Sequence, residues 1–379
     1  MHWTVKLDGG PRRVNHAAIA VGEKIYSFGG YCTGEDSFRT RPMDVHVLNT
    51  ANYRWSLLPS NERSNASNVP FQRYGHTAVA YKGEIYIWGG RNDLFACNQL
   101  YCFNPITHKW SNPKTGGNIP GARDGHSACV VDHQMYIFGG FDDEADRFSQ
   151  SVHVLDLRTM TWRCLMTNNP PPAHRDFHSA TAVGTRMYVF GGRGDLSGAY
   201  HTQEETYCPE IMYLDLVANE WHKPKVTGEK PLGRRSHSAF YYNGYIYIFG
   251  GFNGIMSQHF NNFYRFDPKA NHWAQVKPVG IPPCPRRRQA CIVVGDRMFL
   301  FGGTSPLTLC TDNADAAGED LLDHNDLHVL DFNPTLRQLS LLSVIKNKLD
   351  QSKLPDILRW EIKSIITPNS ISRQLNSTG

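Results

Sequence analysis

The apolar positions of this chain fall into short runs separated by turns. In the stretch 121–168, β-rich runs cover 127–131 and 135–138, and a connection of hairpin length joins them. The pair Gly139-Gly140 ends the second run, where a turn or a close backbone approach leaves no room for a Cβ. Further runs follow at 152–156 and 161–165. The pattern predicts four antiparallel strands in a unit of about 50 residues.

The same unit occurs six times along the chain. Its glycine pairs are 29–30, 89–90, 139–140, 191–192, 250–251 and 302–303. Five copies end with a tryptophan, namely Trp55, Trp110, Trp162, Trp221 and Trp273. The sixth copy has none, whereas Trp3 stands alone before the first copy. We therefore expect an N-terminal strand to complete the last unit and to close the repeats into a ring, with Trp3 in the core.

The double glycine with its following tryptophan resembles the Kelch repeat over about residues 1–333. The resemblance implies an all-β fold, a six-bladed Kelch β-propeller closed by an N-terminal strand. We place the blades at about 12–59, 70–113, 121–168, 173–224, 231–278 and 284–333, with 1–8 completing the sixth. A short α-helical segment is expected at 334–365, and a flexible tail ending in glycine at 366–379.

Composition narrows the possible functions. The net charge of +4 over 379 residues is small and no dense Lys/Arg tract occurs, so nucleic acid is not an expected partner. No apolar stretch is long enough to span a membrane, and the N-terminus does not begin like a signal peptide. The 9 cysteines include no C-x-x-C pair, which favours reduced thiols. We expect a soluble protein of the cytoplasm, the nucleus or both.

An Arg-x-x-His spacing recurs in five copies, and Gln289 replaces the histidine in the sixth. Histidines placed once per blade are spread around a ring, so we expect hydrogen bonds in the core or between blades rather than a metal site. Gln289 keeps such a bond but does not replace a metal ligand or a general base. A copper-oxidase type of Kelch enzyme needs converging His, Tyr and Cys side chains, which this pattern disfavours. We expect no catalytic residues, no metal and no cofactor.

Extra arginines interrupt this pattern in blades 4, 5 and 6, on loops expected at one face near the central channel. Guanidinium forks bind carboxylates through paired hydrogen bonds, so we predict capture of an acidic side chain or a free C-terminal carboxylate. The predicted binding residues are Arg193, Arg235, Ser236, Arg287 and Arg288. The predicted rim comprises Arg91, Arg123, Asp124, Arg175 and Asp176. The alternative is that some of these arginines pair with acids of the rim.

The strand pattern stops after residue 333. Residues 335–345 predict a helix that is apolar over most of its circumference and must dock on the propeller, on a partner or on both. This segment resembles the BC box that binds elongin C, at Thr335, Leu336, Ser340 and Val344. That box usually has Cys at the place of Ser340. A second helix candidate resembles the cullin 2 box, at Leu354, Pro355, Leu358 and Ile362. The alternative is a pair of helices that only caps the propeller.

Together these patterns resemble the Kelch-repeat substrate receptors of cullin 2–elongin B/C ubiquitin ligases. The resemblance implies partners (elongin B/C, cullin 2 and a RING subunit) and substrates with a C-terminal glycine, a C-degron for ubiquitination and proteasomal degradation. Such a receptor supplies proximity and no chemistry of its own.

In the relatives the carboxylate is held at the positions of Arg193 and Arg235. The relatives usually have Ser at the position of Arg235 and Trp at that of Arg288, so both arginines depart from the pattern. Because the chain ends in Gly379, we also expect its tail to enter the pocket of its own or a neighbouring copy. The alternative function is a Kelch scaffold without a ligase role, for instance one associated with chromatin or actin.

Overall fold

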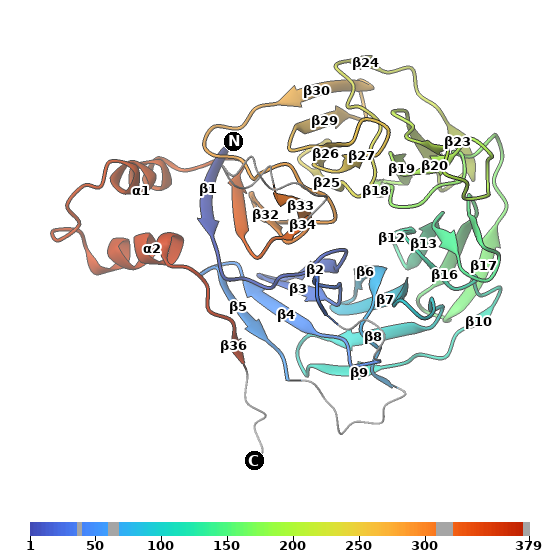
Figure 1. The fold of residues 1–379 in the computed structure, drawn as a ribbon, viewed down its shortest axis with the longest axis horizontal. Helices are drawn as coiled ribbons and strands as arrows, with labels where there is room; N and C mark the ends of the chain where they lie inside the picture. The colour runs from blue at the N-terminus through green and yellow to red at the C-terminus, as the bar shows by residue number, and fades with distance from the viewer. Residues whose placement is uncertain (36–39, 60–67, 308–320, 374–379) are drawn as a thin grey trace.

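The computed structural model describes residues 1–35, 40–59, 68–307 and 321–373. These residues form six antiparallel blades around a central axis, and two helices project from one side (Figure 1). The first strand of each blade lies nearest the axis and later strands lie further out. The predicted all-β propeller with a helical C-terminus is confirmed.

The blades follow one another in chain order. Blades 1 to 3 contain β2 (Ala17–Val21), β3 (Lys24–Phe28), β4 (Val45–Asn49) and β5 (Arg54–Leu57); β6 (Tyr74–Tyr81), β7 (Glu84–Arg91), β8 (Leu100–Asn104) and β9 (Lys109–Ser111); and β12 (Ser127–Val131), β13 (Gln134–Phe138), β16 (Val152–Asp156) and β17 (Thr161–Leu165). Blades 4 to 6 contain β18 (Ser179–Val183), β19 (Arg186–Phe190), β22 (Ile211–Asp215) and β23 (Glu220–His222); β25 (Ser238–Tyr242), β26 (Tyr245–Phe249), β29 (Phe263–Asp267) and β30 (His272–Val276); and β31 (Ala290–Val294), β32 (Arg297–Phe301), β35 (Leu327–Asp331) and β1 (His2–Leu7).

The second strand of each blade is covered on both faces. Met135, Tyr136, Ile137 and Phe138 of β13 are all buried, because neighbouring blades pack against the two sides of the sheet. Such a strand is a continuous apolar run instead of an alternating one. This explains the unbroken run before each glycine pair.

The N-terminal strand closes the ring. β1 pairs antiparallel with β35, and Trp3 lies opposite Leu330 as Trp273 lies opposite Phe266 in blade 5. Trp3 is 7% exposed and its ring is 6.2 Å from that of Phe249, in an edge-on contact between blades 6 and 5. The predicted core position of Trp3 is confirmed.

A ring of backbone hydrogen bonds surrounds the axis. In each blade the residue before the repeated His or Gln has a positive φ, between 48° and 68°. Its N–H donates to the carbonyl of the equivalent residue one blade earlier, over 2.7–3.2 Å. The six residues are Asn15, Gly75, Gly125, Phe177, Ser236 and Arg288, and the last bond runs from Asn15 back to Arg288. Each blade is thus fixed to its neighbours at the channel.

The repeated Arg side chains form hydrogen bonds within their own blades, whereas repeated His side chains form hydrogen bonds to the preceding blade, as predicted. In blades 2 to 6 the guanidinium donates to the carbonyl of the first glycine of its own pair, over 2.8–3.3 Å. His126, for example, is hydrogen bonded to Thr77 of the preceding blade at 2.8 Å. Gln289 keeps an equivalent bond to Ser238 at 3.1 Å.

Extra strands run parallel to the outer edges of some blades. β10 (Gly116–Gly117) lies beside β17 and β24 (Thr227–Gly228) beside β30, each supplied by the segment that leads into the blade. On blade 1 this position is taken by β36 (Ser372–Arg373), which pairs with β5 (Figure 1). Asn369 is buried there, and its backbone N–H donates to the Asp8 carbonyl at 2.7 Å. The flexible tail expected from residue 366 is therefore wrong for these residues, because blade 1 offers them an unpaired edge.

The two helices form an arm between blades 6 and 1. α1 (Leu336–Lys346) starts with a capping box between Thr335 and Gln338, and α2 (Asp356–Ile366) starts after Pro355. An ion pair between Arg337 and Glu361 links the helices. No helix among the described residues has both the length and the apolar character needed to cross a bilayer.

Candidate functional site

The predicted binding residues lie on one face of the propeller. There, the residue after each repeated Arg is bridged to the residue after a glycine pair, as in Asp176 with Arg193, Arg235 with Phe252 and Arg287 with Thr304. Directly opposed residues of antiparallel strands point to the same side, so the two kinds of loop together build this face. Short hairpins extend it, formed by β11 (Arg123–Asp124), β14 (Phe141–Asp142) and β15 (Arg147–Phe148); β20 (Gly194–Asp195) and β21 (Glu205–Thr206); β27 (Phe252–Asn253) and β28 (Gln258–His259); and β33 (Thr304–Pro306) and β34 (Leu321–Asp323).

Arg193 is already engaged by acids. Its Nε and one terminal nitrogen donate to the two carboxylate oxygens of Asp176, at 3.1 and 2.5 Å. Its other terminal nitrogen is 3.5 Å from a carboxylate oxygen of Glu205. Burial acts to lower the pKa of Arg193, but the two carboxylates outweigh burial and raise it. The alternative interpretation of rim pairing therefore holds for Arg193.

Arg287, like Arg288, has no carboxylate partner among the described residues, whereas Arg235 and Arg286 each have one. It lies 4.4 Å from the ring centre of Phe252, and Arg235 lies 5.5 Å from the same ring. Arg235 donates to Glu205 at 3.1 Å. Burial, with the charges of Arg288 and Arg235, lowers the pKa of Arg287 to about 10. A cation held among cations over an apolar ring is suited to receive an anion.

Arg288 and Ser236 line the mouth of the central channel. A cavity of about 140 Å³ lies there, bounded in each blade by the residue of the hydrogen-bonded ring and by the repeated His or Gln that follows it. Arg288 has a φ of 63° and donates to the Tyr31 hydroxyl at 2.5 Å. Its guanidinium lies 5.9 Å from the ring centres of Tyr31 and Phe177. The structure thus brings Arg235, Ser236, Arg287 and Arg288 to one sector.

His259 belongs to the same sector but was not predicted from the sequence. It lies directly opposite Phe252 in the β27–β28 hairpin, with ring centres 4.5 Å apart. Burial, followed by the charges of Arg287, Arg235 and Arg288, lowers its pKa to about 4. The imidazole is therefore neutral near pH 7. The Arg-x-x-His spacing does not include His259. The sequence signal that could have found it is its position in the loop that follows the glycine pair of blade 5.

The predicted rim residues fall into two groups. Arg123 and Arg175 are 3% and 5% exposed and bind glycine carbonyls, so the structure places them inside the blades and not at the rim. Arg91 forms an ion pair with Asp143 at 3.3 Å on the adjoining part of the face. Burial raises the pKa of Asp124 to about 7, with Asp176 acting in the same direction.

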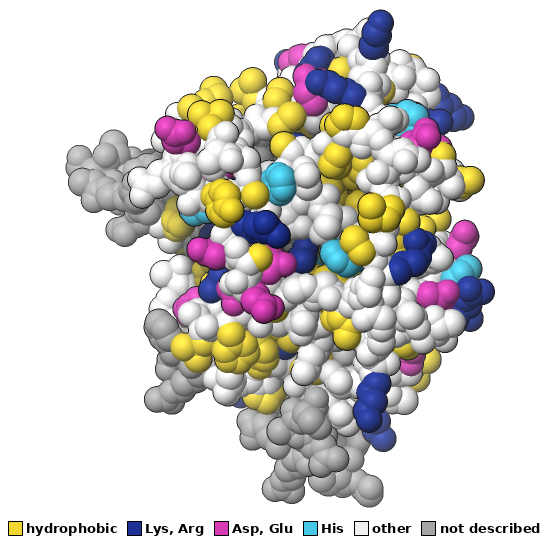
Figure 2. All heavy atoms as spheres, turned by 90° about the vertical axis from the view of Figure 1, so that its right-hand side faces the viewer, with side chains coloured by type: hydrophobic (Ala, Val, Ile, Leu, Met, Phe, Trp, Pro, Cys, Tyr) yellow, Lys and Arg dark blue, Asp and Glu magenta, His cyan; other side chains and the backbone are white. Residues whose placement is uncertain are grey.

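On the flank near β17 and β23, basic and acidic side chains are interspersed (Figure 2).

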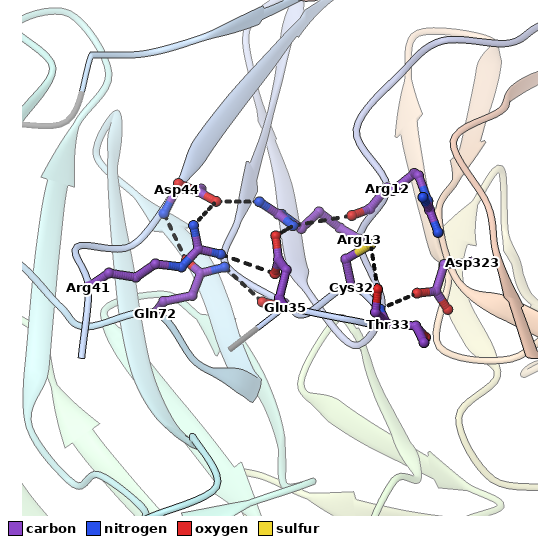
Figure 3. A network of polar contacts seen from close by, with 10 residues as sticks. Arg12, Arg13, Cys32, Thr33, Glu35, Arg41, Asp44, Gln72 and Asp323 are labelled. Atoms are coloured by element: carbon purple, nitrogen blue, oxygen red, sulfur yellow. Dashed lines mark hydrogen bonds and ion pairs between the residues drawn. The ribbon is translucent and has the colours of Figure 1, made fainter. Parts of the chain in front are cut away.

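A polar network braces the loop that carries Tyr31 (Figure 3). Arg13 forms ion pairs with Glu35 and Asp44, and Arg41 pairs with the same two acids. The Thr33 N–H donates to Asp323 of blade 6 at 2.6 Å. The network therefore joins blades 1 and 6 beside Arg288, at the point where the ring closes.

The arm separates the predicted partner residues into exposed and buried ones. Leu336 is 80% exposed, and Ser340 is exposed one turn later, with Val344 partly covered. Leu341 is buried, so α1 uses one face on the protein and leaves another open. In α2, Leu354 and Leu358 are partly covered and Pro355 is exposed, but Ile362 is 1% exposed. This side chain faces inward while Ile357 and Trp360 remain open, and a contact of Ile362 with cullin 2 stays a prediction.

These features define the class of the protein. A family model described as the KLHDC2/KLHL20/DRC7 Kelch-repeats domain matches residues 15–94 and 75–303. The chain belongs to the Kelch-repeat family, whose members are generally non-catalytic binding proteins. It is 50% identical to Kelch domain-containing protein 3 of Homo sapiens and of Bos taurus, over all of this chain and 99% of theirs. It is also 27% identical to Host cell factor homolog hcf-1 of Caenorhabditis elegans, over 73% of this chain and 36% of that protein.

Proposed function

We propose that this chain is the substrate-recognition subunit of a cullin 2–RING ubiquitin ligase and that it binds C-terminal degrons ending in glycine. The observation that carries the proposal is the pair Arg287 and Arg235 over Phe252, with the charge of Arg288 acting on Arg287 from close by. Arg287 and Arg288 have no carboxylate partner among the described residues, so a ligand carboxylate supplies the missing charge.

The surroundings of this cluster suit a peptide. Exposed apolar side chains occupy the loops that follow the glycine pairs of blades 2, 4 and 5: Leu94, Phe95, Leu196, Tyr200, Ile255 and Met256. Exposed apolar groups around a charged centre are typical of a protein-binding face. A terminal glycine has no Cβ, so its carboxylate enters between guanidinium groups without a side chain to accommodate.

The arm supports the second half of the proposal. Leu336 and Ser340 are separated by one helical turn and share an open face, where the BC box resemblance places elongin C. The capping box of Thr335 and Gln338 satisfies N–H groups at the start of α1, so the helix is formed before any partner binds. Elongin B/C, cullin 2 and the RING subunit are the proposed partners, in the cytoplasm or the nucleus.

One experiment addresses both halves. The purified chain is mixed with elongin B/C and cullin 2, and the complex is probed with an array of C-terminal peptides in free-acid and amidated forms. We expect co-elution, and binding of free-acid peptides that end in glycine. Leu336→Asp is expected to abolish co-elution but not peptide binding, whereas Lys346→Asp, on the same helix, is expected to change neither. Peptide binding without co-elution of the unaltered chain would favour the scaffold alternative.

The proposed self-capture of the tail involves Gly379, which lies outside the described residues. The described part of the chain is anchored on blade 1 up to Arg373. Capture of this tail by the pocket of its own or of a neighbouring copy stays a proposal.

A further inference from the structure

His259 is a buried polar side chain without a partner. It is 7% exposed, and neither of its ring nitrogens has a hydrogen-bond partner among the described residues. An unsatisfied buried polar group is costly, so such a group calls for a reason beyond folding.

Blade 3 shows that folding does not need an imidazole here. Phe148 occupies in its hairpin the place of His259, directly opposite Phe141 as His259 is opposite Phe252. Phe148 is fully buried and leaves no polar atom unpaired. The same hairpin position thus accepts a phenyl ring in one blade and carries two unpaired nitrogens in another.

The surroundings of His259 supply donors but few free acceptors. Arg235, Arg287 and Arg288 can only donate hydrogen bonds. The nearby carboxylate of Glu205 is used by Arg193, Arg235 and Tyr207, and that of Asp176 by Arg193. A peptide C-terminus carries a carboxylate that accepts and an amide N–H that donates, so its recognition needs one acceptor beside the arginines.

From this geometry we propose that His259 is a specificity residue of the pocket, whose imidazole accepts a hydrogen bond from the amide N–H of the substrate's last residue. The inference rests on the proposed function and deepens it, because it assigns the main chain of an extended peptide as the ligand of His259. The guanidinium groups hold the carboxylate, and His259 fixes the orientation of the last peptide unit. The neutral state of the ring is essential, since an imidazolium has no acceptor.

The test uses two peptides and two variants of the full chain. The first peptide is the tightest glycine-ending sequence from the array, and the second has an ester oxygen in place of its last amide N–H. The variants are His259→Phe, which copies blade 3, and His272→Phe, a control on the exposed side of β30. Binding is measured by calorimetry and folding by thermal melting.

We expect the unaltered chain to bind the ester about tenfold more weakly than the amide, as the loss of one hydrogen bond implies. His259→Phe is expected to bind both peptides equally, at the level of the ester, with an unchanged or higher melting temperature. His272→Phe is expected to behave as the unaltered chain.

Two results would overturn the inference. One is a tenfold preference for the amide that persists in His259→Phe. The other is an unaltered chain that binds amide and ester alike. Failure of the unaltered chain to bind any glycine-ending peptide would instead refute the proposed function, so the two failures are distinguishable.

Discussion

The ion pair between Arg286 and Asp326 gives a prediction whose size can be worked from the structure. The Arg286 side chain is 1% exposed and meets both oxygens of Asp326, at 2.6 and 2.8 Å. Removing one partner of a buried pair costs about 3–5 kcal/mol, because the other charge stays buried and unpaired. We therefore expect Asp326→Ala to be among the most destabilising single changes in blade 6.

Blade 5 provides a reference for a milder change. There, Arg234 is equally buried and donates to the amide oxygen of Asn262 at 2.6 Å, without a carboxylate. Asp326→Asn recreates this arrangement and keeps one acceptor, so its expected cost is about 1–2 kcal/mol. With an unfolding entropy of about 2.1 cal/mol/K per residue over 379 residues, the expected falls in melting temperature are about 4–6 °C for Ala and about 1–3 °C for Asn.

The effect also depends on pH. Burial acts to raise the pKa of Asp326, but the hydrogen bonds from Arg286 and His328 outweigh burial and hold it well below its usual range. A carboxyl group whose pKa is depressed on folding stabilises the protein above its unfolded pKa of about 3.9 and loses that contribution as the pH falls. The difference in melting temperature between the unaltered chain and Asp326→Asn should thus become smaller as the pH falls from 6 to 3. Equal melting temperatures for the Ala and Asn variants, or a difference that grows on acidification, would refute this reasoning.

Three further outcomes are expected. Trp3→Ala should destabilise the ring by about 3–5 kcal/mol, measured by thermal melting, because the tryptophan is buried between two blades. A chain ending at Pro368 should melt several degrees lower than one ending at Arg373, since only the shorter chain lacks Asn369 and β36. Equal melting temperatures of the two chains would show that β36 does not stabilise blade 1. Arg287→Gln should weaken binding of glycine-ending peptides by about tenfold or more while leaving elongin B/C co-elution intact, and unchanged affinity would exclude Arg287 from the pocket.

The repeat made the blades and the closing strand predictable, because each blade must present the same apolar runs and the same glycine pair. The missing tryptophan of the sixth copy was enough to place Trp3. The docked tail was not predictable in this way, since 369–373 is too short to show an alternating pattern and its partner edge on blade 1 is far away in sequence.

The site was predictable in outline only. The loops that carry Arg235 and Arg287 follow from the repeat, but the state of each arginine depends on acids that only folding brings near. Asp176 precedes Arg193 by 17 residues and belongs to a different loop, so its paired contact with the guanidinium could be named only as an alternative. The burial of Ile362 could not be predicted, because an i, i+4 pattern shows that a helix has an apolar face, not which neighbour covers it.

The arm is attached at two places, through β35 on blade 6 and through β36 on blade 1. It therefore straddles the seam at which the first and last blades meet. A force that a bound partner exerts on the helices therefore acts on both blades, and a displacement of one blade would also move the other. A large assembly bound to α1 and α2 would therefore pull on blades 6 and 1 together, and the two anchor strands would hold these blades side by side.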